Sequence, residues 1–552
     1  MLRSRLDNDT TLSTHADSHP TINSTCSHSH SKFCLLSDEE VRNIILKMPN
    51  KSCSADPIPT QILKECLDEL LPVLSKIVNA SLSSGTFPSI LKSAIVTPVI
   101  KKPSLDTDNL QNYRPISNLK FLGKLIEKAV SIQLQEYLCA NSLQNSLQSA
   151  YRKNHSVETA LLRIYNDLLL TTDNQKESIL VLLDLSAAFD TIDHQVLFKR
   201  LHTEYGIEGT TLDWIRSYFS NRSQVVTIKN MKSAPRYLHC GVPQGSVMGP
   251  PVFTYYTSPV ENIINSHGLQ GMIYADDTQI YVSTSKDERP QNIAKLESCL
   301  NDIRTWCAKN KLVLNDSKTE VIHVTSRFCN TSPVSSIWVG STFISPVHCV
   351  KDLGVFFDDN LTMSTHVNNI CKSASNAIRK ISQIRKYLNQ KSTETLIHAF
   401  VSSRLDNCNS LLFGLPSYQI SKLQRIQNIA ARLVTLTNKR SHIKPILLKL
   451  HWLPISERIN YKILMLVFKS IHGLAPLYIS SLITIQKPTR SLRSSIAVQL
   501  IPPKIKTKTY GERSFLFAAP RLWNALPAQI RNAPNFSSFK RLLKTHLFTK
   551  AL

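Results

Sequence analysis

Apolar residues recur at every third or fourth position along several stretches of this 552-residue chain. Such spacing is typical of an α-helix that buries one face. It predicts helices in residues 36–48, 118–138 and 156–172, and a long helix within 51–85 that stops at Gly85. The same spacing returns at 290–309. From residue 366 onward it continues almost to the end of the chain, which predicts a separate all-helical region.

A second pattern, short apolar runs bounded by turn residues, predicts β-strands between these helices. The run Ile179–Leu183 is long enough only for a buried strand, and it ends at Asp184. Apolar alternation around YADD predicts a hairpin with Asp276 and Asp277 at its tip. Strands and helices are therefore mixed up to about residue 365, an α+β pattern. The other predicted strands lie in 93–102, 224–240, 311–326 and 350–361.

The net charge of +25 is distributed unevenly along the chain. Residues 1–365 hold 35 Lys and Arg against 36 Asp and Glu, whereas residues 366–552 hold 30 against four. A set of solvated helix faces would carry more compensating acids. The basic excess therefore favours a surface that binds a polyanion such as nucleic acid.

Membrane and disulfide-stabilised classes find little support in the sequence. No run approaches the roughly 20 apolar residues that span a bilayer, and the N-terminus lacks the apolar core of a secretory signal. The 12 cysteines include no C-x-x-C pair, so we expect reduced thiols in an intracellular protein. Residues 1–35 are rich in Ser, Thr, His and Asp, and we expect them to be a disordered leader; its SHSH segment with Cys26 and Cys34 could bind a metal only adventitiously.

Three acidic residues carry the candidate chemistry. Asp184 ends one predicted strand, and Asp276 with Asp277 follows roughly 90 residues later on a hairpin. If these strands share a sheet, the carboxylates converge and repel one another. Mg²⁺ prefers such hard oxygen ligands, and two such ions promote phosphoryl and nucleotidyl transfer. The alternative for the acidic pair alone is a solvated turn.

Five motifs, taken together and in this order, resemble reverse transcriptases: NYRPISN, LLDLSAAFDTIDH, GVPQGSVMGP, YADD and LVLNDSKTE. The residues of these motifs are similar to those of non-LTR retrotransposons of the long interspersed element type. This resemblance covers about residues 85–365, and SRLDNCNSLLFGLP, HWLPISERINYKILMLVF and APRLWNALPAQIR resemble the tail of such elements. It implies a right-hand polymerase with fingers, palm and thumb. The expected domains are a leader (1–35), a helical linker segment (36–84), fingers and palm (85–365), a helical thumb (366–450) and a basic helical C-terminal extension (451–552).

The resemblance also implies an RNA-directed DNA polymerase, a nucleotidyltransferase that uses an RNA template, a DNA primer and deoxynucleoside triphosphates. Asp184, Asp276 and Asp277 would be its catalytic residues and would bind two Mg²⁺ (or Mn²⁺) ions. The backbone carbonyl of Leu185 would be a further metal ligand. Leu353 and Gly354 match the hairpin that grips the primer.

Six further residues match the family's nucleotide-binding positions. Lys101 and Arg114 match the fingers residues that hold the triphosphate, and their cationic groups suit phosphate oxygens. Phe189 falls at the aromatic gate that excludes a ribose 2′-OH. Gln244 and Gly245 match the segment beneath the nascent base pair. Lys318 matches a lysine near the pyrophosphate, a possible general acid.

Several positions depart from the family pattern or stand outside its chemistry. Asp190 and Asp193, which flank the gate, are expected to be structural. Pro251 follows Pro250 where an apolar residue is usual, and this is tolerable only in the first turn of a helix. Pro259 stands inside an expected palm helix. These prolines keep open the alternative of an inactive relic that only binds nucleic acid.

The family comparison carries expectations about context as well. Residues 1–84 are too short for the endonuclease domain of complete elements, so we expect an N-terminally truncated copy whose endonuclease, if it is active, is supplied by another chain. Chromosomal priming in the family implies a nuclear site of action. An intron maturase is disfavoured by the C-terminal motifs, and a small-molecule phosphatase would leave the basic region unexplained.

Overall fold

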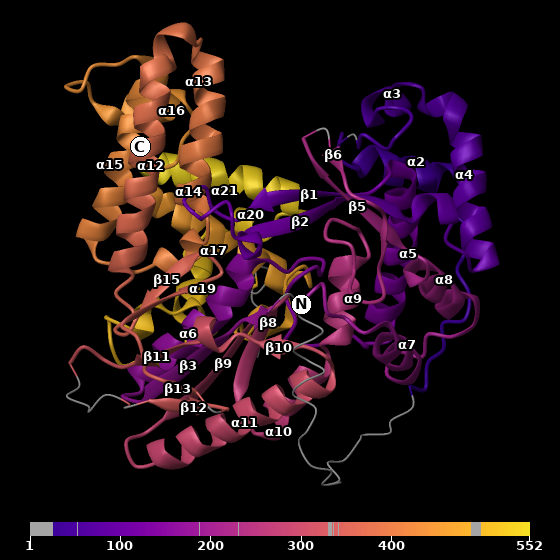
Figure 1. Cartoon of the computed structure of the whole chain (residues 1–552). Helices are drawn as coiled ribbons and strands as arrows, with labels where there is room; N and C mark the ends of the chain where they lie inside the picture. The colour runs from indigo at the N-terminus through magenta and orange to yellow at the C-terminus, as the bar shows by residue number, and fades with distance from the viewer. Residues whose placement is uncertain are drawn as a thin grey trace. The chain divides into compact units, whose positions relative to one another are not determined.

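The computed structural model describes residues 26–551 except 52, 187, 230, 329–333, 335, 341 and 487–497. Its internal contacts divide the chain into two interleaved units. The predicted fingers-and-palm segment 85–365 supplies residues to both of them, and the whole of 366–552 falls in the second (Figure 1). Unit 1 comprises Met1–Gln148, Leu185–Ile263 and Asn301–Asn315; unit 2 comprises Ser149–Asp184, Ile264–Leu300 and Asp316–Leu552.

Unit 1 is mainly helical at its N-terminal end, as predicted. α2 begins with a capping box in which Ser37 and Glu40 satisfy each other's backbone N–H groups. α4 ends at Gly85, which has the left-handed φ of +62° expected of a stop. Both helices pack with α5, and α4 also packs with α8. The helices of this unit are α2 (Asp38–Lys47), α3 (Thr60–Glu65), α4 (Leu67–Ser84), α5 (Phe121–Ala140), α7 (His194–Thr203), α8 (Gly209–Phe219) and α9 (Gly249–Tyr256).

Residues 26–35 correct one prediction. Most of the expected leader, residues 1–25, lies outside the described residues. The remainder is not disordered: the His30 N–H donates to the Gly206 carbonyl at 2.9 Å, and the His30 ring stacks on Tyr137 with 4.8 Å between ring centroids. Phe33 is buried against Trp214. This segment is polar in composition, but long-range backbone pairing and one aromatic anchor hold it in place.

The main sheet of unit 1 is built on β1 and β2, which pair antiparallel with Val99 opposite Arg114. β1 also pairs in parallel with β5, and the predicted hairpin in 224–240 is formed by β5 with β6 and β7. A separate short pair joins β4 to β10. These strands are β1 (Ser93–Ile100), β2 (Tyr113–Asn118), β4 (Leu185–Ser186), β5 (Ser223–Ile228), β6 (Met231–Lys232), β7 (Arg236–Tyr237) and β10 (Val313–Leu314).

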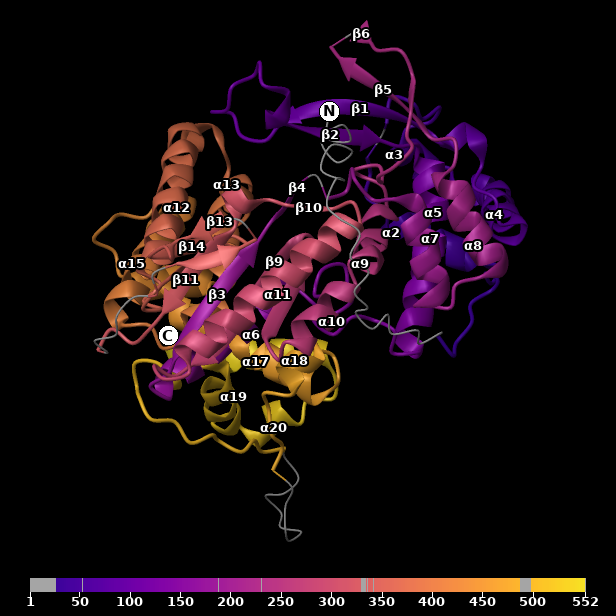
Figure 2. The same ribbon diagram turned by 60° about the horizontal axis from the view of Figure 1, so that its bottom comes forward.

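Unit 2 contains an antiparallel sheet of four strands in the order β11, β3, β9, β8. Figure 1 labels all four strands, and Figure 2 labels β11, β3 and β9 in a second view. β3 is buried along almost its whole length, as its apolar run predicts. The hairpins predicted around YADD and in 350–361 are present as β8–β9 and β14–β15. The strands are β3 (Glu177–Leu183), β8 (Gln270–Tyr274), β9 (Asp277–Thr284), β11 (Glu320–Val324), β12 (Ile337–Val339), β13 (Thr342–Ile344), β14 (Cys349–Asp352) and β15 (Val355–Asp358).

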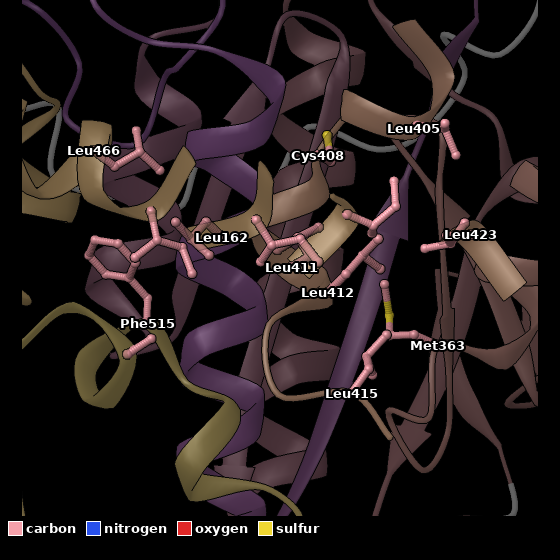
Figure 3. Close-up of a cluster of buried hydrophobic side chains, with 14 of the residues drawn as sticks. Leu162, Met363, Leu405, Cys408, Leu411, Leu412, Leu415, Leu423, Leu466 and Phe515 are labelled. Atoms are coloured by element: carbon pink, nitrogen blue, oxygen red, sulfur yellow. The ribbon is translucent and has the colours of Figure 1, made fainter. Parts of the chain in front are cut away.

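One face of this sheet shares its hydrophobic core with the C-terminal helices. Leu180 and Tyr281, opposite each other on β3 and β9, belong to the same buried cluster as Phe515 and Leu547. α6 (Val157–Asp173) lies against β3 and β8 within this core. Figure 3 shows its side chain Leu162 among leucines of the 405–423 segment and Phe515. The C-terminal region therefore completes the core of the sheet and is not a detachable tail.

Helices α12 and α15 of the C-terminal region run parallel to each other. At one end Gln419 of α15 donates to the Thr362 carbonyl and to Ser364 of α12. At the other end the buried Arg385 donates to the last carbonyls of α15, Leu433 and Val434, a favourable pairing with the helix dipole. The helices are α12 (Ser364–Ile384), α13 (Gln390–Ile397), α14 (Ser403–Asp406), α15 (Ser417–Thr435), α16 (Ile443–Lys449), α17 (Ile455–Ile471), α18 (Leu477–Ser480), α19 (Phe515–Asn524), α20 (Ala528–Arg531) and α21 (Phe536–Ala551).

The segment 498–510 departs from the predicted helical pattern. It contains only an isolated bridge between Leu500 and Ile485, and adjacent prolines at 502 and 503 account for the lack of a helix. Asp173, buried at the end of α6, accepts N–H groups from Lys506 and Thr507 at 2.9 and 2.7 Å. Side-chain recognition by one carboxylate thus fixes an irregular stretch of chain.

The prolines singled out in the sequence occupy permitted positions. Pro250 and Pro251 lie in the first turn of α9, where no intrahelical N–H partner is needed. The expected single palm helix is two helices, because α9 ends at Tyr256 and α10 (Pro259–Ser266) begins at Pro259. Pro259 is thus the first residue of a helix and not an interior one. α11 (Arg289–Lys309) agrees with the predicted helix at 290–309.

No helix among the described residues is long and apolar enough to cross a membrane. Every cysteine in the described part of the chain is free of a disulfide, as expected for reduced thiols.

Candidate active site

The register of β3 on β9 places two of the predicted acidic residues opposite each other. The last paired positions of these strands are Leu183 and Thr278. One residue further along each strand lie Asp184 and Asp277, and their side chains project on the same face because side chains alternate along a strand. Unit 2 therefore brings together the carboxylates that the sequence separates by roughly 90 residues.

Asp276 occupies the turn between β8 and β9. Tyr274 and Asp277 are the closing pair of this hairpin, so Ala275 and Asp276 form a two-residue loop. Ala275 has a φ of +60°, the left-handed value that two-residue hairpin turns need at their first central position. The prediction of a hairpin tip is thereby refined: Asp276 is in the turn itself, and Asp277 is the first residue of a strand.

Burial and like charge act together on Asp277. Desolvation, followed by the charges of Asp276 and Asp184, raises the pKa of the Asp277 carboxyl to about 6. The positive charge of Lys318 opposes this shift in the Asp277 pKa. The Lys318 ammonium lies 2.9 Å from an Asp184 oxygen. The three carboxylates are thus close enough to repel one another, and nearby positive charge relieves the repulsion.

The donor set fits a hard divalent cation, with one qualification from geometry. Among the residues described, no three His, Cys, Asp or Glu side chains converge closely enough to hold a metal by themselves. Mg²⁺ commonly uses only one or two carboxylates and completes its shell with water and substrate phosphate. Asp184, Asp276 and Asp277 offer that kind of open, oxygen-only platform, and their mutual repulsion favours cation binding.

Gln244 and Gly245 lie in a loop, residues 241–248, that is hydrogen-bonded to the strand bearing Arg114. The Ser117 N–H on β2 donates to the Gln244 carbonyl at 2.8 Å. Gly245 has a φ of +109°, and a Cβ there would lie 2.9 Å from the Ser117 carbonyl oxygen. Glycine is required at this position both for its backbone conformation and for the close approach.

The predicted gate residue is held against the same loop of unit 1. The Val242 N–H donates to the Phe189 carbonyl, and the Phe189 ring stacks on Phe253 of α9 with centroids 4.9 Å apart. Gln244 donates through Nε2 to both carboxylate oxygens of Asp190 at 3.2 Å. Unit 1 therefore brings Phe189, Gln244 and Gly245 together in and beside the 241–248 loop.

The two flanking acids have separate structural partners. Asp193 caps α7 by accepting the backbone N–H groups of Gln195 and Val196. Asp190 instead fixes the side-chain amide of Gln244, a role the sequence analysis did not assign.

The two predicted phosphate-binding cations lie on the β1–β2 hairpin. Arg114 is exposed on β2. Lys101 follows β1, where its backbone N–H donates to the Asn112 carbonyl and its ammonium donates to the Gln111 carbonyl at 2.8 Å. Both cations therefore lie on one pair of hydrogen-bonded strands of unit 1 or at its end.

Leu353 and Gly354, predicted to grip the primer, form the two-residue turn of β14–β15 in unit 2. Asp352 and Val355 are the closing pair, and both turn residues have positive φ, +45° and +92°. Such a turn matches the twist of its flanking strands. The Leu353 side chain packs against the hydrophobic core, which anchors the turn from beneath.

Sequence reasoning missed a buried carboxylate under the 241–248 loop. Glu127 of α5 is 1% exposed and accepts the backbone N–H groups of Val247 and Met248 at the start of α9. Burial raises its pKa. A signal was present, because Glu127 shares the buried stripe of α5 with Gly123 and Val130. A charged residue on such a stripe is unusual unless it binds something.

Residues 100–357 match the sequence model of the reverse transcriptase (RNA-dependent DNA polymerase) family. Over these residues the chain is similar to reverse transcriptases. The match takes in every residue that the motifs assigned to metal, nucleotide or primer, from Lys101 to Gly354. The mixed α and β elements of this segment agree with the predicted α+β class.

Three curated proteins that resemble the chain come from mobile elements of Drosophila melanogaster. The chain is 27% identical to a probable RNA-directed DNA polymerase from transposon BS of Drosophila melanogaster, over 72% of this chain and 44% of that protein. It is 26% identical to the RNA-directed DNA polymerase from mobile element jockey of the same species, over 71% and 42%. A probable RNA-directed DNA polymerase from transposon X-element, again of that species, is 25% identical, over 72% and 43%. The chain thus spans less than half the length of these relatives.

Proposed function

We propose that the chain is the RNA-directed DNA polymerase of a non-LTR retrotransposon. It would copy an RNA template by adding deoxynucleotides to the 3′ end of a DNA primer. The observation that carries this proposal is the placement of Asp184 opposite Asp277, with Asp276 in the adjoining turn, inside the segment that is similar to reverse transcriptases.

Asp184, Asp276 and Asp277, with the Leu185 carbonyl, would hold two Mg²⁺ or Mn²⁺ ions. Bound divalent ions supply positive charge that stabilises the attacking and leaving oxygens of nucleotidyl transfer. The raised pKa of Asp277 supports this role, because a site whose carboxylates repel one another gains most from a cation. Lys318 would carry positive charge beside the same carboxylates, and its ammonium is available to protonate the leaving pyrophosphate.

The nucleotide would be held by unit 1. Arg114 and Lys101 would neutralise its triphosphate, and the fixed ring of Phe189 would leave no room for a ribose 2′-OH. The Gly245 backbone, which has no side chain, allows a base pair to approach closely. With its amide nitrogen bound to Asp190, Gln244 keeps its amide oxygen for a sugar hydroxyl.

The helices after residue 366 would form the thumb and a basic extension that bind the nucleic acid backbone. α12 and α15 contain no Asp or Glu. The exposed cations of α12 and of the turn after it recur at helical spacing, and Lys422 of α15 joins this face through a 3.0 Å bond to Asn368. An acid-free cationic face suits phosphate contacts. The exposed cations of this face are Lys372, Arg379, Lys380 and Lys386.

An inactive relic that only binds nucleic acid was the alternative, and its main argument was the double proline. Pro250 and Pro251 lie in the first turn of α9, where proline is tolerated, so they give no reason for inactivity. We therefore favour the active polymerase.

Primer extension on an RNA template with Mg²⁺ tests the proposal. The purified chain should extend a DNA primer with deoxynucleotides, and Asp276→Ala should abolish extension while it leaves salt-sensitive nucleic-acid binding intact. Asp359→Asn is the matched control, since Asp359 lies on unit 2 and bonds only an exposed His348 in the ion pairs described. Binding without extension by the unaltered chain would overturn the proposal in favour of the relic.

A further inference from the structure

Two buried polar side chains join the Leu353–Gly354 turn to the strand that begins at Asp277. Gln279 lies on β9 between Leu182 of β3 and Met272 of β8, and it is 1% exposed. Asp352, the last residue of β14, is 3% exposed. Gln279 Nε2 donates to Asp352 Oδ1 at 2.9 Å. This bond is a side-chain link between a predicted catalytic strand and the predicted primer hairpin.

The remaining oxygens of this pair reveal an imbalance of donors. Neither Gln279 Oε1 nor Asp352 Oδ2 has a hydrogen-bond partner among the residues that the structure describes, although both atoms are buried. Each is an acceptor if Asp352 is ionised, so neither can satisfy the other. Leaving two buried acceptors without donors destabilises the folded chain, because both atoms lose their hydrogen bonds to water. One additional proton between them would satisfy both atoms.

Among the described residues, no cation is a cause of the pKa shift of Asp352. The ionisable groups that face it are the Asp277 carboxyl on β9 and the Cys408 thiol, which precedes the short helical turn at Asn409–Leu412. Lys462, which also lies near Cys408, is ion-paired with Glu158 at 2.9 Å. Burial, and then the charge of Asp277, raises the pKa of Asp352 to about 7 even though Gln279 opposes the shift.

We propose that Asp352 is a neutral carboxylic acid that forms a reciprocal pair with Gln279 and clamps the Leu353–Gly354 turn onto β9. Gln279 donates to Oδ1, and the acid proton on Oδ2 is donated to Gln279 Oε1. Asp352 is then a positioning residue: it holds the turn in register with Asp277, which lies two residues from Gln279. The link to primer placement rests on the proposed polymerase function, whereas the acid–amide pair does not.

Isosteric replacement separates a neutral acid from a charged one. Asp352→Asn presents one acceptor and one N–H donor to Gln279, so it reproduces both bonds without a titratable group. Asp352→Leu removes both bonds and leaves the Gln279 amide buried and unpaired. Gln279→Glu places two carboxyls together, and the double variant Gln279→Glu with Asp352→Asn restores an acid–amide pair with the acid on the other strand.

Thermal unfolding at about pH 6, below the Asp352 pKa of about 7, tests the pair independently of activity when it is measured on the full chain without divalent cations. We expect Asp352→Asn and Asp359→Asn to melt within about 1 °C of the unaltered chain. Asp352→Leu and Gln279→Glu should melt several degrees lower, and the double variant should recover most of the loss of Gln279→Glu. If Asp352→Asn destabilises as much as Asp352→Leu, the neutral acid is wrong. If the double variant does not recover, the pairing is wrong.

Primer extension well below the melting temperature reads the positioning role. Asp352→Leu should lower kcat at least about tenfold while the KM for the nucleotide stays within about twofold, because a displaced primer end affects only the reacting geometry. Asp352→Asn should retain the original kcat. Equal kcat for both variants would overturn the positioning role. Absence of extension in the unaltered chain would overturn the polymerase proposal, and the melting pattern would still decide the pair.

Discussion

Asp184 and Asp277 are placed by the register of two neighbouring strands, whereas Gln244 and Gly245 are placed by hydrogen bonds from segments far away in the sequence. The first arrangement gathers like charges, and the raised pKa of Asp277 records their repulsion. The second arrangement satisfies its polar groups internally, through Ser117, Asp190 and Glu127.

This difference separates two kinds of preorganisation. The carboxylates of unit 2 repel one another when no cation is bound. Relief of this repulsion adds to the affinity for a cation. The 241–248 loop of unit 1 has its conformation fixed before any ligand binds, by a glycine and by backbone hydrogen bonds. Neutral substitutions at the carboxylates should therefore lower activity without lowering stability. Substitutions in the loop should lower both activity and stability.

The largest effect is expected from Asp184→Asn. Loss of one metal-binding carboxylate should reduce primer extension about 1,000-fold or more, because cation binding and charge stabilisation fail together. The same change removes a repulsive partner of Asp277, so the melting temperature without divalent cations should not fall. A parallel drop in activity and in melting temperature would contradict the stored-repulsion account.

Gly245→Val should give the next largest effect. The added side chain meets the Ser117 carbonyl oxygen and a φ of +109° disfavours it, so the loop must move away from β2. We expect kcat/KM for the nucleotide to fall roughly 100-fold, from steady-state extension kinetics. Gly268→Val is the matched control, since Gly268 also has a positive φ but nothing lies within 4 Å of its Cβ. Equal losses for the two variants would show that the close approach is irrelevant.

Replacing Lys372, Arg379, Lys380 and Lys386 with glutamine should weaken nucleic-acid binding by roughly tenfold or more at low salt. The plot of log Kd against log salt should also flatten, by about 0.7–0.9 for each phosphate that the variant no longer neutralises. Fluorescence anisotropy over a salt series measures both quantities. An unchanged slope would show that another surface binds the phosphates. Replacing these four cations should leave kcat nearly unaltered when the protein is saturated with nucleic acid.

The smallest expected effect concerns pH and Asp277. Its folded-state pKa of about 6 exceeds its ordinary value of 3.8, so the folded chain keeps a proton that the unfolded chain releases between these values. Stability should therefore fall as pH rises from about 4 to about 6, by on the order of 1–2 kcal/mol for this partly exposed group. Asp277→Asn should make that slope shallower in thermal unfolding without divalent cations, and Asp352, whose pKa is raised to about 7, should account for the slope that remains. Affinity for Mg²⁺ should change in the opposite direction and weaken below pH 6, since a protonated carboxyl is a poor ligand.

The elements that the sequence predicted well depend on local patterns. The buried run of β3, the YADD hairpin and the stop at Gly85 all follow from spacing or from one turn residue. The positions of Pro250 and Pro251 could also be predicted, because proline is restricted to a helix's first turn.

Long-range pairing has no comparable local signal. Three examples each join segments that are distant in the chain. They are the backbone hydrogen bonds of His30 and Ser31, the hydrogen bond between Ser117 and Gln244, and the pair of Gln279 with Asp352. Charged residues at inward positions were the available hints. Glu127 lies on the buried apolar face of a helix, and Asp352 is at a buried position of a strand in which buried and exposed residues alternate. Neither position indicates which residue the carboxylate binds.

The carboxylate of Asp173 has a practical consequence for shortened forms of the protein. Its donors are Lys506 and Thr507, and the Gly511 that follows them leaves no space for a side chain beside it. A chain cut before Lys506 would retain a charged, solvent-excluded carboxylate without its donors, at the end of the helix that supports the catalytic strands. Such fragments should expose apolar surface and aggregate on expression, even though the family-matched residues remain whole. The smallest independently folding form of the chain is therefore expected to reach well beyond residue 511.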